Sequence, residues 1–226
     1  MSGKLFMVAT PIGNLQDMSQ RGLDTLRNCD LIVCEDTRVT SKLLTSYGIS
    51  KPLAIVHEHT QPASVEKTIR RIHEGENVAY VCDAGTPNMN DPGGKLVEAA
   101  YEAGLTIVPI PGASALTAAI SVCGFDLQEF HYLGFIPHKK GRQTLFKQIA
   151  ENKISSIFLE STHRIDKTID SLSTELEENR LVFVGRELTK MHETLYRGTA
   201  KEVAVRLKNT STKGEFVIIV GPKPKR

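Results

Sequence analysis

The chain lacks the short motifs that mark several large enzyme classes. Its 226 residues contain no GxGxxG, no Walker phosphate loop, no GxSxG and no HExxH. Dehydrogenases, P-loop NTPases, the matching serine hydrolases and zinc proteases therefore lose their main sequence support. The apolar run at Leu5 to Ala9 is too short for a signal peptide or a membrane-spanning helix. We expect a cytoplasmic protein with no part in the membrane.

The sequence has neither a large net charge nor closely spaced cysteines. The formal net charge is only +2, so a nucleic acid would have to be bound by a local basic surface. The cysteines, Cys29, Cys34, Cys82 and Cys123, show no CxxC spacing, which favours reduced thiols over disulfides or zinc. His57-Glu58-His59 puts two imidazoles on one face of an extended segment, but no further ligands are evident, so we expect no metal.

What the sequence does contain is a set of loops rich in glycine and proline. The segment Asp83 to Gly94 holds three glycines and two prolines and follows an apolar, strand-like run. Thr10 to Asn14 and Pro109 to Ser114 have the same character and the same position after a strand. Glycine permits close approach of another group, and proline fixes the path of the chain. Because such loops meet at one edge of a parallel sheet, we expect a ligand site there.

The order of strand-like and helix-like segments predicts two α/β domains. Five strand–helix pairs alternate up to Ser121, which is typical of a parallel sheet with helices on both faces. After Gly124 the short, charged last strands favour a mixed sheet. We expect an N-terminal α/β domain over residues 1–121 and a C-terminal α/β domain over residues 122–226. The helices are expected at 19–27, 40–47, 64–74, 95–103, 114–121, 142–150, 164–177 and 201–207.

Charged side chains follow several of these strands. Glu35 to Arg38 ends the second strand, and Glu160 to Arg164 and Arg186 to Lys190 end strands of the second half. His138 to Arg142 is a short basic loop of the type that contacts phosphates, although a solvated helix start is the commoner fate of such a run. Ser114 begins a helix whose free amides would suit a carboxylate or phosphate, with a simple capped helix as the alternative.

Taken in order, the motifs of the chain closely resemble those of the bacterial ribosomal RNA small subunit methyltransferase I family, which has the tetrapyrrole methylase fold. The resemblance covers essentially the whole chain. Its motifs lie at Val8 to Leu15, Glu35 to Arg38, His57 to His59, Asp83 to Gly93, Pro111 to Leu116, Gly134 to Pro137, Lys139 to Gly141, Glu160 to Arg164, Arg186 to Lys190 and Lys213 to Phe216.

The resemblance implies S-adenosylmethionine as cofactor, two α/β domains with the active site in the cleft between them, and a homodimer. It also implies 2′-O-methylation of a decoding-region cytidine in 16S rRNA, presented as naked rRNA or as the 30S subunit. The chain departs from the family at Cys82 and Asn90, where serine is usual, and at Thr60, where asparagine is usual. Two alternatives stay open: a methyltransferase of the same fold acting on a tetrapyrrole or other small molecule, and a non-catalytic RNA-binding module.

These motifs define three sets of expected site residues. Cofactor contacts are expected from Pro11, Gly13, Asp83, Ala84, Gly85, Thr86, Asp91, Gly93, Pro111, Gly112, Ala113, Ser114, Ala115, Glu160, Ser161, Gly214 and Glu215. A side chain must accept the proton of the ribose hydroxyl, and the hypotheses are Glu35, Asp36, Glu58, Glu160, Glu187 and Lys190. RNA contacts are expected from Arg38, Lys139, Lys140, Arg142, Arg164 and Lys190.

Overall fold

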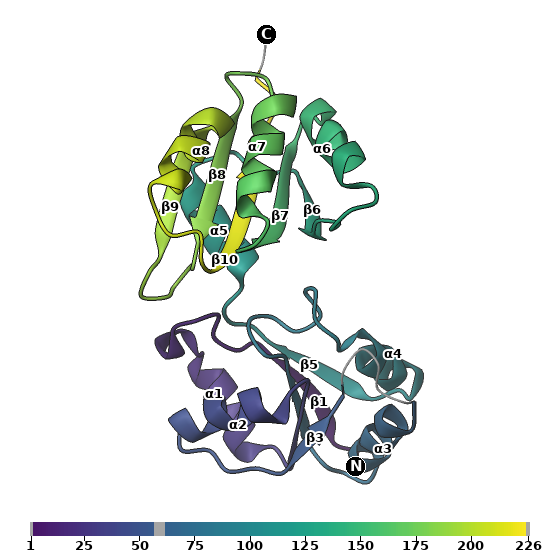
Figure 1. Ribbon diagram of the computed structural model, residues 1–226. Coiled ribbons are helices and arrows are strands. Elements are labelled where there is room, and N and C mark those ends of the chain that lie inside the picture. The colour runs from purple at the N-terminus through teal and green to yellow at the C-terminus, as the bar shows by residue number, and fades with distance from the viewer. Residues whose placement is uncertain (1, 57–61, 225–226) are drawn as a thin grey trace. The chain divides into compact units, whose positions relative to one another are not determined.

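The computed structural model describes residues 2–56 and 62–224. Its contacts divide the chain into two compact units, Met1–Ser114 and Ala115–Arg226 (Figure 1). The division falls at the start of helix α5 (Ala115–Cys123), whereas the sequence predicted it near the end of that helix. Each unit contains a five-stranded sheet with helices, which confirms the predicted pair of α/β domains. No helix in the described part of the chain is long and apolar enough to cross a membrane.

The first unit is built on a parallel sheet, as predicted. Its strands are β1 (Lys4–Val8), β2 (Leu31–Cys34), β3 (Leu53–Ile55), β4 (Val78–Val81) and β5 (Thr106–Ile110). They lie in the order β3-β2-β4-β1-β5, and neighbouring strands pair in parallel. Because β1 lies between β4 and β5, the loops that follow these three strands leave the sheet next to one another.

Helices cover both faces of the first sheet. Helices α1 (Gln20–Asn28) and α2 (Thr37–Ser46) lie on one face, and α3 (Pro62–His73) and α4 (Gly94–Glu102) lie on the other (Figure 1). A short 3-10 helix at Leu15–Asp17 was not predicted. All residues of β2 and β4 are buried, which explains why these strands read as continuous apolar runs instead of alternating ones.

The second unit has a mixed sheet, which confirms the second half of the predicted fold. Its strands β6 (Phe130–Phe135), β7 (Ser155–Ser161), β8 (Leu181–Arg186), β9 (Thr194–Thr199) and β10 (Glu215–Val220) lie in the order β6-β7-β10-β8-β9. The β6–β7 pair is parallel, and the pairs β7–β10, β10–β8 and β8–β9 are antiparallel.

One face of this second sheet carries helices α6 (Arg142–Glu151), α7 (Ile165–Glu175) and α8 (Ala200–Lys208), while α5 lies against the other face (Figure 1). The core under α6, α7 and α8 is apolar and includes Phe146, Phe158, Ile169, Val203 and Phe216. Burial of these large side chains supplies the hydrophobic stabilisation of the unit.

Arg180 is a buried cation that closes the end of α6. Only 1% of its surface is exposed. Its Nε donates to the carbonyl of Gly221 at 2.9 Å, and Nη1 donates to the carbonyls of Ile149 and Ala150 at 3.0 and 2.8 Å. Nη2 donates to the carbonyl of Asn152 at 3.0 Å. The last carbonyls of a helix lack helical partners and attract cations, so one guanidinium satisfies several of them.

Replacing Arg180 with methionine should lower the free energy of unfolding by about 3 to 5 kcal/mol, because buried carbonyls would lose charged hydrogen-bond donors. Urea unfolding of parent and variant measures the change. Lys201→Met is the matched control, since the ion pair of Lys201 with Glu178 is exposed and should matter little. Equal loss of stability in the two variants would contradict the anchoring role of Arg180.

Candidate functional site

Three loops at the carboxyl edge of the first sheet are tied together by hydrogen bonds. The amide of Thr10 donates to the carbonyl of Gly85 at 2.9 Å, and the amide of Gly85 donates back to Thr10 at 3.0 Å. The hydroxyl of Thr10 also donates to the carbonyl of Cys82 at 3.3 Å. The loop after β5 joins this assembly through Thr86, whose hydroxyl donates to the carbonyl of Ala113 at 3.1 Å. The predicted loops are therefore one connected structure.

Gly85 and Gly112 permit this close packing for different reasons. The φ angle of Gly85 is +82°, a left-handed conformation that side chains rarely adopt, and a Cβ there would lie 3.3 Å from Cγ2 of Ile12 and 3.8 Å from the carbonyl oxygen of Ala113. At Gly112 the cause is steric alone, because a Cβ would lie 3.0 Å from the Cβ of Ala9. Both positions thus favour glycine.

Tyr80, in β4, contacts the far end of the long loop that follows this strand. The Tyr80 hydroxyl donates to the carbonyl of Pro92, and a Cβ on Gly93 would lie 3.0 Å from the tyrosine ring. Asn88 and Asn90 have φ angles of 72° and 88°, a conformation that asparagine tolerates better than most residues. Backbone of this kind persists only where its surroundings fix it, and it is common in ligand-binding loops.

Carboxylates give the loop edge of the first unit a negative charge. Arg38 pairs with Asp36 through Nη2 at 2.6 Å and Nε at 3.0 Å, and this hydrogen bonding lowers the pKa of Asp36 to about 2. Partial burial raises the pKa of Asp83, and the charge of Asp36 adds to the effect. Burial also raises the pKa of Asp91, which hydrogen-bonds Cys82. Asp83 lies within electrostatic range of both Asp36 and Asp91, and this grouping of carboxyl groups favours cationic groups over phosphates.

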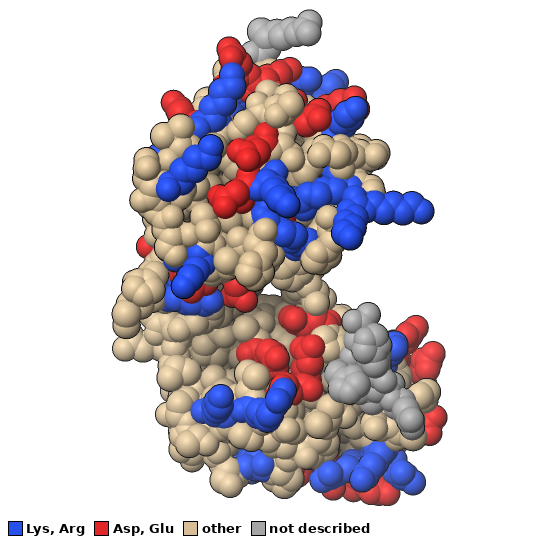
Figure 2. Space-filling view, in the orientation of Figure 1, with Lys and Arg blue, Asp and Glu red and all other residues tan. Residues whose placement is uncertain are grey.

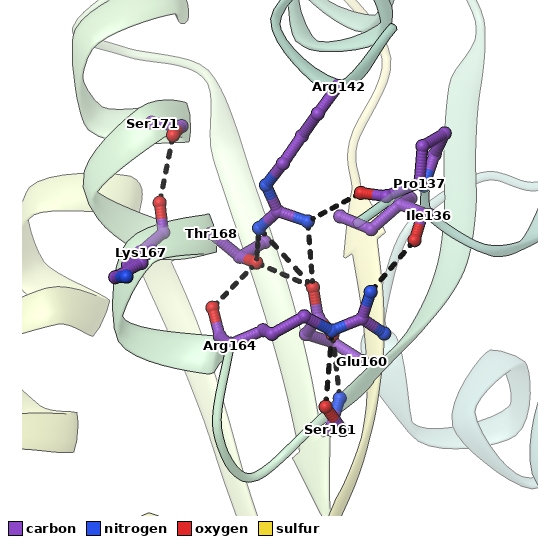
Figure 3. Close-up of polar contacts among 9 residues, drawn as sticks. All are labelled: Ile136, Pro137, Arg142, Glu160, Ser161, Arg164, Lys167, Thr168 and Ser171. Carbon is purple, nitrogen blue, oxygen red and sulfur yellow. Dashed lines mark hydrogen bonds and ion pairs between the residues drawn. The ribbon is translucent and has the colours of Figure 1, made fainter. Parts of the chain in front are cut away.

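Glu160, at the end of β7 in the second unit, is buried between two arginines (Figure 3). Its Oε1 lies 2.7 Å from Nε of Arg164 and accepts a hydrogen bond from the amide of Ser161 at 2.8 Å. Its Oε2 accepts from the hydroxyl of Thr168 at 2.7 Å and lies 3.4 Å from Nη1 and Nη2 of Arg142. Both carboxylate oxygens are engaged, and this favours a structural role for Glu160.

A second charged group lies where β8 ends and β10 begins. Nζ of Lys190 is 2.9 Å from Oε1 of Glu187 and 3.0 Å from Oε2 of Glu215. Burial lowers the pKa of Lys190, but its hydrogen bonds to the two carboxylates outweigh burial and the net shift is upward, so the ammonium keeps its proton. Gly214 has φ of +126°, and a Cβ there would lie 2.5 Å from Cγ of Glu187, so this turn requires glycine.

The remaining predicted residues lie in the same loops, and their roles stay predictions. In the first unit these residues are Pro11, Gly13, Glu35, Ala84, Gly93, Pro111 and Ser114. In the second unit Ala115 begins α5, and Lys139 and Lys140 are exposed in the loop before α6. Glu58 lies outside the described residues, as do His57, His59 and Thr60.

The structure also locates the groups that bear on metal binding. Cys29, Cys34, Cys82 and Cys123 are buried free thiols. Over residues 2–56 and 62–224, no group of three or more His, Cys, Asp or Glu side chains is arranged to hold a metal ion.

The sequence motifs and this fold can now be set beside known proteins. The family model of the tetrapyrrole (corrin/porphyrin) methylases matches residues 4–204. The chain belongs to this family. The matched range runs from β1 into α8 and so includes strands of both sheets.

Relatives of this methylase share a name. Ribosomal RNA small subunit methyltransferase I of Haemophilus influenzae is 42% identical over 228 residues, covering 100% of this chain and 81% of the relative. The protein of that name from Thermotoga maritima is 39% identical over 221 residues, which cover 98% of this chain and 99% of the relative. The solved structure of diphthine synthase aligns with a TM-score of 0.75 over 99% of this chain and 92% of that one. The sequence identity is 16%, so the comparison shows similarity of fold alone. The motif resemblance is confirmed, and the reaction class of this methylase is methyl transfer.

Sequence reasoning did not assign a role to Thr10 or Thr168, two residues that join these assemblies. Thr10 is 1% exposed and lies between β1 and Pro11, and a threonine between an apolar run and a proline-containing loop was a usable signal. Thr168 lies on α7 and reaches Glu160 across eight positions of sequence, so no local pattern could have indicated the contact.

Replacing Asp91 with asparagine should make the methylase more stable at neutral pH. Burial raises the pKa of Asp91 in the folded state, so folding disfavours its ionised form, and this cost appears as the pH rises through the raised pKa. Below the unfolded pKa of about 3.9 the carboxyl is protonated in both states and the cost is absent. The stability gain of the variant should therefore grow with pH.

Urea unfolding from about pH 4 to about pH 8 measures this trend. Asp170→Asn, at an exposed position of α7, is the control. If the gain from Asp91→Asn does not depend on pH, or if the variant is less stable than its parent at neutral pH, the buried-charge explanation is wrong.

Proposed function

We propose that this methylase transfers the methyl group of S-adenosylmethionine to the ribose 2′-hydroxyl of a cytidine in the decoding region of 16S rRNA, and that it works as a cytoplasmic homodimer. The observation that carries the proposal is the 42% identity, over the full chain, with a protein named Ribosomal RNA small subunit methyltransferase I. The motif resemblance supplies the finer points, which are the cofactor, the 2′ oxygen and the cytidine.

For this reaction the main task of the protein is to align the reacting atoms of cofactor and substrate. When bound, S-adenosylmethionine would supply an electrophilic methyl group to the 2′ oxygen and would leave as a neutral thioether, and the hydroxyl proton would pass to a base. The reacting atoms must be nearly collinear and about 3 to 3.5 Å apart. A rigid site serves this need, and the hydrogen bonds from Thr10 to Gly85 and from Thr86 to Ala113 provide rigidity.

The joined loops of the first unit suit S-adenosylmethionine in shape and charge. Gly85 and Gly112 bring backbone close to backbone and leave polar main-chain groups unobstructed by side chains. The carboxyl groups of Asp83 and Asp91 complement the sulfonium and ammonium charges of the cofactor. The predicted contacts from the second unit, Ser161, Gly214 and Glu215, are part of the same proposal.

The ion pairs narrow the choice of proton acceptor. Four of the six predicted acceptors form ion pairs: Asp36, Glu160, Glu187 and Lys190. A paired carboxylate binds a proton weakly and a paired ammonium retains its own, so these groups are poorly suited to accept the hydroxyl proton. Glu35, partly buried just after β2, remains a hypothesis from the sequence. Glu58 remains a hypothesis from the sequence alone.

The exposed loop before α6 is the proposed contact with the RNA backbone. Lys139 and Lys140 are exposed, and Gly141, with φ of +84°, is the N-cap of α6. Figure 2 shows Lys and Arg side chains gathered on the face of the second unit that carries α6 and α7. Lysine side chains beside a helix amino terminus attract phosphate through both charge and helix dipole. Arg38 is less suited to this role, because Asp36 neutralises it.

A direct test offers cofactor with an isotopically labelled methyl group to the enzyme together with 30S subunits, naked 16S rRNA or a porphyrinogen. We expect the label in ribosomal RNA, and nucleoside analysis should recover it as 2′-O-methylcytidine. Label on a base would refute the proposed target atom. Label on the porphyrinogen alone would show instead that the enzyme is a small-molecule methyltransferase of the same fold.

Gly85→Ala should weaken cofactor binding at least about tenfold, because the side chain strains the backbone and meets Ile12 where the loops join. Calorimetry measures the affinity. Gly48→Ala is a matched control, since Gly48 also has positive φ, +64°, but no described atom lies within 4 Å of its Cβ position. Both variants should lose about 1 to 2 kcal/mol of stability. Equal cofactor affinity in the two would argue against a ligand-binding role for the joined loops.

Replacing Lys139 and Lys140 together with alanine should weaken binding of 30S subunits and flatten its salt dependence. Each lost phosphate contact removes about 0.7 to 0.9 from the slope of log affinity against log salt. Cofactor affinity should stay at the parental value. The double change Lys201→Ala and Lys208→Ala, on the exposed surface of α8, removes the same charge elsewhere. If both double variants flatten the slope equally, only the overall charge matters and the loop is not a contact.

A further inference from the structure

We infer that Glu160 is a positioning residue for RNA binding, acting through Arg142 and Arg164 to hold the basic loop, defined as residues 138–141, at a fixed place. The inference rests on the proposed function, because it assumes that Lys139 and Lys140 of this loop contact RNA. It assigns Glu160 a task different from proton transfer or cofactor contact.

The two arginines hold the chain at the point where the basic loop begins. Nη1 of Arg142 donates to the carbonyl of Pro137 at 3.2 Å. Nη1 of Arg164 donates to the carbonyl of Ile136 at 3.0 Å. These are the two carbonyls directly before the loop, and Figure 3 shows both guanidinium groups directed toward them. The side chain of Ile136 is itself 2% exposed and packed in the core, so the start of the loop is fixed.

Glu160 is the group that keeps both arginines in this arrangement. Its side chain is fully buried, and the side chains of Arg142 and Arg164 are only 12% and 15% exposed. Thr168 completes the link, because its hydroxyl donates to Glu160 at 2.7 Å and lies 2.6 Å from Nη2 of Arg142. Without the carboxylate, two guanidinium charges would remain in a poorly solvated space and would repel each other.

The far end of the basic loop is fixed as well. Gly141 caps α6, and the guanidinium of Arg142 lies 5.0 Å from the ring centre of Phe146 in the next turn of that helix. Residues 137–141 are nevertheless exposed. The loop is therefore exposed between two anchored ends, and its lysines lose less conformational freedom when they contact a phosphate than they would on a mobile loop.

The two arginines also contribute positive charge near the basic loop, which the carboxylate of Glu160 reduces but does not cancel. Two arginines against one glutamate leave the cluster of Glu160, Arg142 and Arg164 with a formal charge of +1. This charge lies beside Lys139 and Lys140 and adds to their attraction for phosphate. The arginines thus support RNA binding from inside the unit, whereas the sequence suggested that they contact RNA directly.

The test compares Glu160→Gln, the double variant Lys139→Ala with Lys140→Ala, and the three changes combined. We expect Glu160→Gln to raise the KM for 30S subunits about tenfold and to leave cofactor affinity unchanged. In the lysine-free background Glu160→Gln should raise KM no further, because a residue that acts through the lysines has nothing left to position. Arg180→Lys is the control for lost stability, since it disturbs another buried arginine without touching the basic loop.

Trypsin supplies a readout that does not depend on activity. Under native conditions cleavage after Lys139 and Lys140 should be faster in Glu160→Gln than in the parent and in Arg180→Lys, because the loop is no longer held. An unchanged cleavage rate, additive effects on KM or a loss of cofactor affinity would overturn the inference while the parent still methylates rRNA. A parent that binds cofactor but leaves rRNA unmodified would instead refute the proposed function, whatever trypsin shows.

Discussion

The exchange of backbone hydrogen bonds between Thr10 and Gly85 is the interaction on which the candidate site of the first unit depends. It joins the loop after the central strand β1 to the loop after β4, two segments far apart in sequence. Position 85 has a left-handed backbone, and position 112 of the neighbouring loop is so close to Ala9 that a small residue is needed there. Glycine meets both needs. A parallel sheet brings the loops to one edge, and these bonds turn them into one rigid structure.

The two units differ in the charge that they present. The loop edge of the first unit carries Asp36, Asp83 and Asp91, and Arg38 pairs with Asp36. The second unit exposes Lys139 and Lys140 above a buried cluster of net positive charge. Such a separation of negative and positive surface would suit a protein that binds both a cationic cofactor and a polyanionic substrate, because a surface of one sign would repel one of the two. The division of charge agrees with the proposed function.

Much of the fold could be predicted from sequence because strand and helix periodicity are local properties. Helix α2 shows where this fails: the sequence placed its start at Thr40, yet it begins at Thr37. The cause is Asp36, whose side chain accepts a hydrogen bond from the amide of Arg38 and caps the helix earlier. The loops of the first unit were recognised because glycine and proline restrict the backbone in ways that depend little on distant residues.

The charged residues were harder to place. Lys139 and Arg142 stand in one basic run, but the first is exposed and the second is bound to Glu160, eighteen positions away in sequence. The sequence of this run does not show which basic residue is exposed and which is buried in an ion pair, because the partner of the buried charge is set by packing between α6, α7 and β7. The same holds for Lys190, which reads as a basic site residue until Glu187 and Glu215 are seen beside it.

Amide hydrogen exchange with and without S-adenosylmethionine tests the central claim most directly, since it reports on the joined loops residue by residue. At saturating cofactor, the account predicts slower exchange at residues 10–14, 83–94 and 111–113 together, with no change in α8. Saturable binding that leaves all three loops at their original exchange rates, or that slows one of them alone, would contradict the view that they form a single rigid ligand site.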